Sequence, residues 1–167
     1  MKRQTVLVRI LLLISAITVI AQSPRDDRGL MQYTQTTSGY WVDPSTGLMW
    51  AAKDNGKDVN WKNAIKYCHS LRLAGYSDWR LANMWELQPI FDNRINAPGR
   101  AGNRPATWHI KGDLFLTGNQ WAYDWSRHAS GYHYYFDFNE GKSDSQPSGA
   151  PYPYSFMRAL CVRGSAD

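Results

Sequence analysis

Gly75-Tyr76-Ser77-Asp78-Trp79-Arg80-Leu81-Ala82-Asn83-Met84-Trp85-Glu86-Leu87 is the stretch from which the fold of this chain is most readily argued. Asn83 and Glu86 stand at the spacing of a capping box, in which each side chain binds a free backbone N–H group. Asp78 and Arg80 flank Trp79 and can pair with each other or with neighbouring residues. The stretch therefore predicts a strand end, a turn and a capped helix. We interpret Asp78, Trp79, Arg80, Asn83 and Glu86 as structural residues, because the one Glu of this stretch already serves the helix N-terminus.

Two helices are expected on either side of this stretch. Apolar residues from Asn60 to Leu71 recur at i, i+3, i+4 and i+7, which predicts a helix with one buried face. Asn60 is its expected N-cap, and Cys68 lies on the buried side. A second, shorter helix is predicted from Asn83 to Phe91, and Pro89 should end it early because proline lacks a backbone donor.

The remaining apolar segments are short and predict strands separated by loops. In Tyr132–Phe138 the alternation places Tyr134, Phe136 and Phe138 in the core and His133, Tyr135 and Asp137 towards solvent. Pro and Gly are frequent in Asn93–Asp113 and Ser143–Tyr154, so we predict loops there. The other expected strands are Tyr40–Val42, Leu48–Trp50, Leu114–Thr117, Gln120–Ser126 and Phe156–Arg163. Helices followed by short antiparallel strands and long loops indicate an α+β domain.

The N-terminal segment has the pattern of a secretory signal peptide. Residues 1–21 combine a basic start, an apolar run from Ile10 to Ile20 and a small-residue cleavage site at Ala21. The apolar run is too short for a comfortable membrane span, so we expect no stable membrane insertion. We predict a secreted or periplasmic protein with a signal peptide (1–21), a flexible lead-in (22–38) and one domain (39–164).

The charge of the chain argues against nucleic acid as a partner. The formal net charge is +5, and removal of Lys2, Arg3 and Arg9 with the leader leaves about +2. A nearly neutral domain lacks the overall basic character of a nucleic-acid-binding protein. Any recognition of a polyanion must therefore depend on a local group of basic residues.

Five segments resemble, in order, the motifs of the Lcl C-terminal domain family, which is named after a bacterial collagen-like adhesin. They run from about Gly39 to Gly164, with departures at Ala82 and at Trp121-Ala122-Tyr123. The DWRLANMWEL segment is similar to the family core DWRLPT..EL, in which two positions are open. The resemblance implies a C-type-lectin-like fold, as in formylglycine-generating enzymes. The other segments are Asp43–Trp50, Asn60–Cys68, Tyr134–Gly141 and Met157–Gly164.

Cys68 and Cys161 are the two cysteines of the chain. In an exported protein an even number of cysteines indicates a disulfide, and two buried free thiols are the alternative. Export together with the family resemblance favours the disulfide.

Residue patterns for catalysis are scarce. The four His show no paired metal-ligand spacing, and neither of the two Glu has an acid/base partner. We therefore expect no metal, no cofactor and no enzymatic activity. DWRLANMWEL also resembles a segment of formylglycine-generating enzymes, but those enzymes use reactive cysteines that are close in sequence. An oxidoreductase of that type is the least favoured alternative. Resemblance to calcium-dependent sugar-binding proteins is weak and limited to Gln146-Pro147-Ser148.

What remains is a secreted binding module. The resemblance implies an adhesin-like domain that recognises glycans, sulfated polyanions or a cell-surface protein. Basic residues without intervening acids lie in the Asn93–Asp113 segment, and Trp108 or Tyr152 can stack on sugar rings. The alternative is a protein-interaction domain that uses exposed aromatic residues, and a solvated basic loop without a ligand is equally compatible with the sequence. The ligand-binding hypothesis names Arg94, Arg100, Arg104, Lys111 and Trp108.

Overall fold

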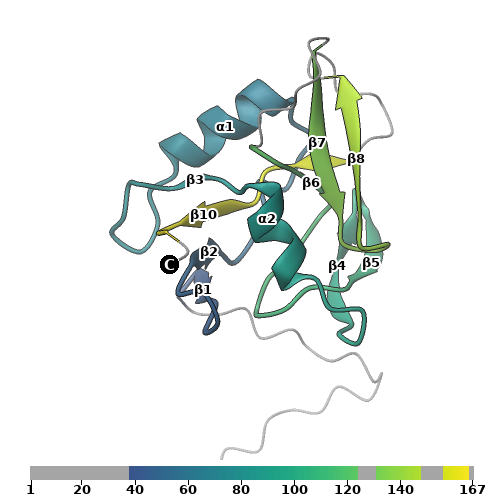
Figure 1. Cartoon of the computed structure of the whole chain (residues 1–167), viewed down its shortest axis with the longest axis horizontal. Helices are drawn as coiled ribbons and strands as arrows, with labels where there is room; N and C mark the ends of the chain where they lie inside the picture. The colour runs from purple at the N-terminus through teal and green to yellow at the C-terminus, as the bar shows by residue number, and fades with distance from the viewer. Residues whose placement is uncertain (1–37, 124–130, 148–155, 166–167) are drawn as a thin grey trace, which may run out of the picture. The chain divides into compact units, whose positions relative to one another are not determined.

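Two four-stranded sheets and a separate two-stranded hairpin account for the strands of the structure, a computed structural model (Figure 1). It describes residues 38–123, 131–147 and 156–165, all within one compact unit, 33–167. The predicted signal peptide, nearly all of the predicted lead-in and Tyr152 lie outside the described residues.

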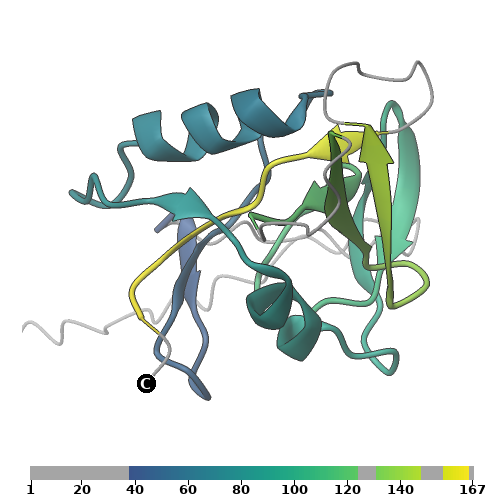
Figure 2. The ribbon, with the colours of Figure 1, turned by 45° about the horizontal axis from the view of Figure 1, so that its top comes forward.

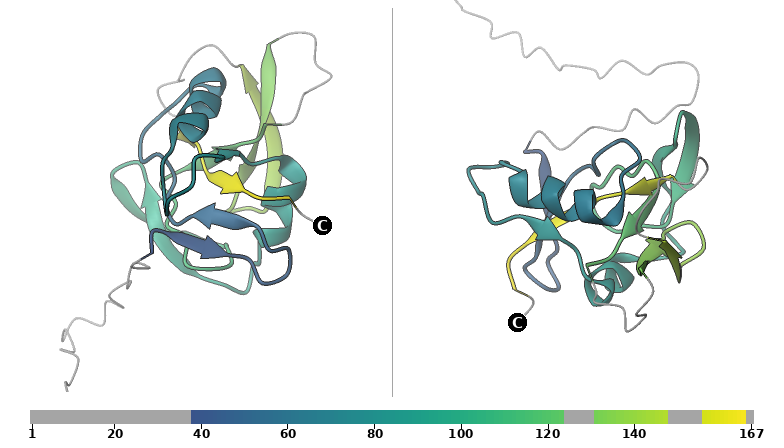
Figure 3. Two further views of the ribbon diagram at one scale, coloured as in Figure 1. Left: turned by 90° about the vertical axis from the view of Figure 1, so that its left-hand side faces the viewer. Right: turned by 90° about the horizontal axis from the view of Figure 1, so that it is seen from above.

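The first sheet joins the two ends of the domain. Its strands follow the order β1-β2-β10-β3, and every neighbouring pair is antiparallel. Figure 3 shows β1, β2 and β10 side by side. The strands are β1 (Tyr40–Val42), β2 (Met49–Ala51), β3 (Arg80–Leu81) and β10 (Cys161–Arg163).

A side chain closes the predicted β1–β2 turn. The Asp43 carboxylate is buried and accepts hydrogen bonds from Ser45 N (3.0 Å), Ser45 Oγ (2.7 Å) and Thr46 Oγ1 (2.8 Å). Burial alone raises the pKa of the Asp43 carboxyl, but these hydrogen bonds lower it more, so its net pKa falls below the ordinary value. Because β1 and β2 pair antiparallel on either side of this turn, the predicted hairpin is confirmed.

Helix α1 (Trp61–Ser70) lies across the β3 side of the first sheet (Figure 2). Asn60 is its N-cap as predicted, since its side chain accepts a hydrogen bond from Asn63 N at 2.9 Å. Cys68 is fully buried and forms a disulfide with Cys161, with a Cα–Cα distance of 5.4 Å. The predicted bridge is thus confirmed, and it ties the helix to the last strand.

Helix α2 (Met84–Leu87) continues directly into the 3₁₀ turn η1 (Gln88–Ile90). Both halves of the predicted capping box are present, and Asn83 N donates to Glu86 Oε2 at 2.8 Å. Pro89 stands at the start of η1, where its missing donor is tolerated but no α-helix continues. The short, early-ending helix predicted from Asn83 is therefore confirmed.

The second sheet has the order β8-β7-β6-β9. Its β6–β9 pair is parallel, so the prediction of purely antiparallel strands is wrong at this edge. The expected single strand Phe156–Arg163 is also wrong, because the chain crosses from the second sheet to the first at the buried residues Ala159 and Leu160. The strands are β6 (Asn119–Trp121), β7 (Tyr132–Asp137), β8 (Lys142–Pro147) and β9 (Met157–Arg158).

The segment predicted as one long loop, Asn93–Asp113, contains a hairpin of β4 (Ala97–Ala101) and β5 (Arg104–Trp108). A Gly-Asn pair, Gly102-Asn103, connects the strands, and such pairs favour two-residue hairpin turns. Gly99 is required because a Cβ there would lie 2.5 Å from the Leu116 carbonyl oxygen. The loop prediction failed because Pro and Gly inside β4 conceal the strand pattern.

Two further expectations are wrong for related reasons. Residues 142–147 form β8 and not the start of a loop, since an edge strand can remain paired without an apolar face. Leu114–Thr117 makes only an isolated bridge, between Phe115 and Lys53, although Leu114 and Leu116 are buried. Burial and strand pairing are therefore separate properties in this segment.

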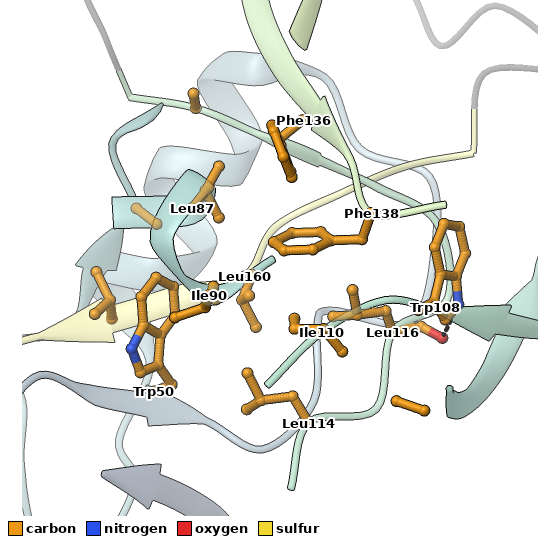
Figure 4. Packing of buried hydrophobic residues seen from close by; sticks show 14 of the residues in the cluster. Trp50, Leu87, Ile90, Trp108, Ile110, Leu114, Leu116, Phe136, Phe138 and Leu160 are labelled. Carbon is orange, nitrogen blue, oxygen red and sulfur yellow. Dashed lines mark hydrogen bonds between the residues drawn. The ribbon is translucent and has the colours of Figure 1, made fainter. Parts of the chain in front are cut away.

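Most of the large apolar side chains pack between the two sheets. Trp50, Ile110 and Phe138 are fully buried there, and Figure 4 shows them with Trp108 and Leu160. A second cluster surrounds the disulfide, under α1. The predicted core position of Trp50 is confirmed.

On β7 the predicted alternation holds for its core side. Phe136 and Phe138 are buried, while Tyr134 is partly buried against the same cluster. The opposite side does not simply face solvent, because the His133 ring stacks on Trp61 with a centroid distance of 3.6 Å. Packing against α1 therefore covers part of this face.

Candidate functional site

The basic residues predicted to bind a ligand are not equivalent in the structure. The Arg94 guanidinium makes two hydrogen bonds to the Asp92 carboxylate, Nε to Oδ1 at 2.9 Å and Nη2 to Oδ2 at 2.7 Å. The Arg94 guanidinium holds the pKa of the Asp92 carboxyl well below its usual range. The charge of Arg94 is therefore compensated by an ion pair.

Lys111 and Trp108 serve local structure. The Lys111 ammonium donates to the Pro89 carbonyl oxygen at 2.8 Å. Trp108 is only 5% exposed, and its indole N–H lies 3.1 Å from the Leu116 carbonyl oxygen (Figure 4). The proposed stacking of a sugar on Trp108 is corrected accordingly, because the ring face is packed in the core.

Arg100 and Arg104 remain accessible near the end of the β4–β5 hairpin. Both are exposed, and no ion pair engages either one within the three described ranges. Arg100 pairs with Pro105 in the ladder, and Arg104 pairs with Ala101. Since successive side chains alternate between faces, the two guanidinium groups leave the hairpin on opposite sides.

The face that carries Arg104 borders a hollow of about 390 Å³. The hairpin forms one wall, and β6, the β7–β8 turn and Phe156 form the others. By ladder register, Arg104 shares its face with Ala101 and Ala106, which line this hollow. The full lining consists of Ala101, Ala106, Thr107, Trp108, Asn119, Asp137, Asn139 and Phe156.

Phe156 provides an accessible aromatic ring beside the hairpin turn. Its side chain is 39% exposed, and a Cβ at Gly102 would lie 2.5 Å from the ring. Asn119 and Asn139 add amide groups that donate and accept hydrogen bonds, while Asp137 Oδ1 accepts from Asn139 N at 2.7 Å. An aromatic ring, amides, a carboxylate and a nearby arginine together suit a hydroxylated ligand. We call these residues, together with Arg100 and Arg104 at the end of the β4–β5 hairpin, the hairpin site.

Sequence reasoning found Arg100 and Arg104 but missed the rest of the hairpin site. Asp137 was expected to face solvent, and Phe156 was assigned only to a strand. Their proximity to Gly102 and Ala101 depends on contacts between segments thirty-five or more residues apart. The Gly-Asn pair was the one local signal that could have indicated a hairpin here.

The residues predicted to be structural are buried or hydrogen-bonded, and three of them, Arg80, Asn83 and Glu86, line a second hollow. Trp79 is buried, Asp78 pairs with Arg163 at 2.8 Å, and Arg80 pairs with Glu86 in a two-pronged contact of 2.8 and 2.6 Å. The hydrogen bonds to Glu86 raise the pKa of Arg80 above its ordinary value. These pairings resolve the prediction, since Asp78 and Arg80 each bind a neighbour and not each other.

A buried polar group anchors the loop after β2 to the second sheet. The Asp54 carboxylate accepts from Thr117 N at 2.6 Å and from Thr117 Oγ1 at 2.8 Å, and Arg158 Nε donates to the same hydroxyl at 2.6 Å. Burial raises the pKa of the Asp54 carboxyl. Asp54, Thr117 and Arg158 are thus linked by hydrogen bonds, so we assign this network to the architecture.

Within the described ranges, no three His, Cys, Asp or Glu side chains gather in a way that could hold a metal ion. No helix of these ranges reaches the length and hydropathy that crossing a bilayer requires. Both sulfur atoms of the described cysteines are joined in the buried Cys68–Cys161 bridge.

Comparison with known proteins places these observations in a family. A family model described as the Lcl C-terminal domain matches residues 39–163, most of the chain and nearly all of the described residues. A comparison with curated proteins finds no match.

Proposed function

The chain belongs to the Lcl C-terminal domain family, and from this premise we propose that it is a non-catalytic module that binds glycans or sulfated polyanions. Membership of the family indicates an adhesin-like or binding module. The proposal adds the ligand class and the location, which is a cell surface or the extracellular matrix after export.

The observation that carries the proposal is the exposure of the two arginines at the hairpin site and their lack of an acidic partner among the described residues. Arg100 and Arg104 are exposed and lack an acidic partner in the described ranges, whereas Arg94 is paired with Asp92. A guanidinium group presents a planar fork of donors that fits sulfate or carboxylate oxygens. Because the two arginines project from opposite faces of one hairpin, a linear polymer that passes over its end can contact both.

We also propose that the domain has a C-type-lectin-like fold. Support comes from the first sheet, which joins the first and last strands, and from the disulfide between α1 and β10. The same buried disulfide supports a structural role for the cysteines and disfavours the oxidoreductase alternative, which requires reactive thiols.

Heparin chromatography of the purified protein tests the ligand class. We expect retention at low salt, since contacts between exposed charges weaken as ionic strength rises. The Arg100→Ala/Arg104→Ala variant should bind about 5- to 30-fold more weakly, which corresponds to roughly 1–2 kcal/mol. Thermal unfolding must match that of the native protein, so that weaker binding does not reflect a lost fold.

An Arg72→Ala/Arg94→Ala variant is the matched control. It removes the same amount of charge from exposed arginines outside the hairpin, of which Arg94 pairs with Asp92 and Arg72 donates to backbone carbonyl oxygens. If both double variants elute at the same reduced salt concentration, the binding is general charge attraction and the hairpin site is not its cause. Failure of the native protein to bind at low salt would overturn the polyanion proposal, and a salt-insensitive protein partner would favour the alternative.

A further inference from the structure

Trp85 is the most exposed large apolar side chain of the described residues, at 59%. A single exposed apolar residue is common on protein surfaces and needs no explanation by itself. This one, however, borders a cleft of about 490 Å³ whose other walls are polar. The lining residues are Arg80, Asn83, Trp85, Glu86, Gly164 and Ser165.

The walls of this cleft are fixed by hydrogen bonds and are nearly neutral. Arg80 binds both oxygens of Glu86, at 2.8 and 2.6 Å, and Arg80 Nη2 also donates to the Gly164 carbonyl oxygen at 3.0 Å. The two opposite charges therefore cancel inside the cleft. Because the ion pair is already formed, a ligand does not have to order these side chains when it binds.

Hydrogen-bonding capacity remains in the cleft. A guanidinium group has five N–H donors, and the contacts to Glu86 and Gly164 use three of those on Arg80. The Asn83 side-chain oxygen accepts in the capping box, so Asn83 offers its NH2 group, and Ser165 offers a hydroxyl. The indole of Trp85 is amphipathic, with an apolar face and one N–H donor.

These properties together select a class of ligand. A strongly anionic group gains little, since Glu86 offsets the charge of Arg80, and a purely apolar ligand would leave the polar walls unsatisfied. A pyranose ring presents one face of C–H groups and a rim of hydroxyls. We propose that the Trp85 cleft is a binding site for an uncharged sugar, with the ring stacked on Trp85 and its hydroxyls hydrogen-bonded to Arg80 and Asn83.

The Trp85 cleft is separate from the hairpin site, since no residue lines both hollows. The proposal does not depend on the hairpin site.

The test is a titration of the full chain with uncharged methyl glycosides of glucose, mannose, galactose and N-acetylglucosamine. The indole N–H signals of the eight tryptophans are followed by NMR, and the Trp85→Phe variant identifies the Trp85 signal. We expect at least one glycoside to shift that signal with a dissociation constant in the millimolar range, typical of a single small contact. The affinity should be unchanged in about 1 M NaCl, since no net charge is involved.

Variants decide the outcome. Trp85→Ala should weaken binding of that glycoside at least about tenfold, while Trp85→Phe should retain most of it, because an aromatic face remains. Tyr123→Ala, which removes another exposed aromatic side chain, and Arg100→Ala/Arg104→Ala should leave it unchanged. The proposal is overturned if no glycoside shifts the Trp85 signal, if Trp85→Ala binds like the native protein, or if about 1 M NaCl abolishes the binding. None of these results depends on whether heparin is retained.

Discussion

The hairpin site and the Trp85 cleft both combine arginine with an aromatic side chain, yet the arginine charge is uncompensated in the first and neutralised in the second. At the hairpin, Arg100 and Arg104 are exposed without an acidic partner in the described part of the chain. In the cleft, Arg80 is held by both oxygens of Glu86. Residue type is therefore a poor guide to ligand type, and the partner of each arginine decides whether it attracts an anion or acts as a neutral donor.

The comparison also separates two consequences of changing salt. Binding at the hairpin site should weaken with ionic strength, because it depends on uncompensated charge. Binding in the cleft should not, because stacking and neutral hydrogen bonding are only weakly screened. One protein thus offers an internal control for the electrostatic contribution to glycan recognition.

The largest expected effect comes from removing the disulfide, which holds the segment 156–164. This segment contributes to both the hairpin site and the Trp85 cleft. Phe156 precedes β9 and Gly164 follows β10, with Cys161 between them. The disulfide closes a loop of 93 residues, so Cys68→Ser/Cys161→Ser should lower the free energy of unfolding by about 4–5 kcal/mol. Urea denaturation of the variant and of the native protein measures the difference. A change below about 1 kcal/mol would show that the bridge adds little to the fold.

An intermediate effect is expected from breaking the ion pair of the cleft. Glu86 is 6% exposed and also caps α2, so Glu86→Gln should cost about 2–3 kcal/mol through the uncompensated Arg80 charge. The same change makes the cleft cationic, and heparin retention should increase. Unfolding free energy and elution salt are the two measurements. If heparin retention stays constant while stability falls, Arg80 is not accessible to polyanions. That result would contradict the statement that its ion pair with Glu86 is what prevents Arg80 from attracting an anion.

The smallest effect is expected at the Asp92–Arg94 pair, in which the Arg94 side chain is 85% exposed and the Asp92 side chain 11%. Arg94 lowers the pKa of Asp92 in the folded protein. The ionised carboxylate therefore contributes stability at a pH above the pKa of Asp in the unfolded chain, near 3.9. This contribution is lost as the pH falls through the lower pKa of the folded state. Asp92→Asn should leave the urea midpoint at pH 7 nearly unchanged and make its decline below about pH 4 shallower. The freed Arg94 should raise the salt concentration of elution from heparin slightly. A steeper acid decline in the variant would contradict the assigned sign.

Local patterns in the sequence were sufficient for some elements. The helix at Asn60–Leu71, the capping box at Asn83 and Glu86, and the early end at Pro89 depend on residues within one or two turns of each other. For the same reason the β1–β2 turn around Asp43 was predictable. Each of these features satisfies its hydrogen bonds locally, so its signal is present in a short window.

Elements that depend on distant partners were predicted less well. The β4–β5 hairpin has Pro and Gly where a strand pattern was sought, and it is stabilised by Trp108 and Leu116 packing against Gly99. β8 is polar and owes its conformation to pairing with β7. The parallel β6–β9 pair joins residues that are far apart in the chain. No local window contains these partners, so propensity alone could not reveal them.

By itself, the sequence determined the family, the α+β class, the two helices and the cysteine pair that forms the disulfide. These follow from residue types and short spacings, which are written directly in the chain. Only the tertiary structure decided which of the described arginines lack an acidic partner, that Trp108 is buried while Trp85 is exposed, and that Phe156 lies beside the hairpin. The physical reason is that burial and charge compensation depend on neighbours in space, and folding brings those neighbours from distant parts of the chain.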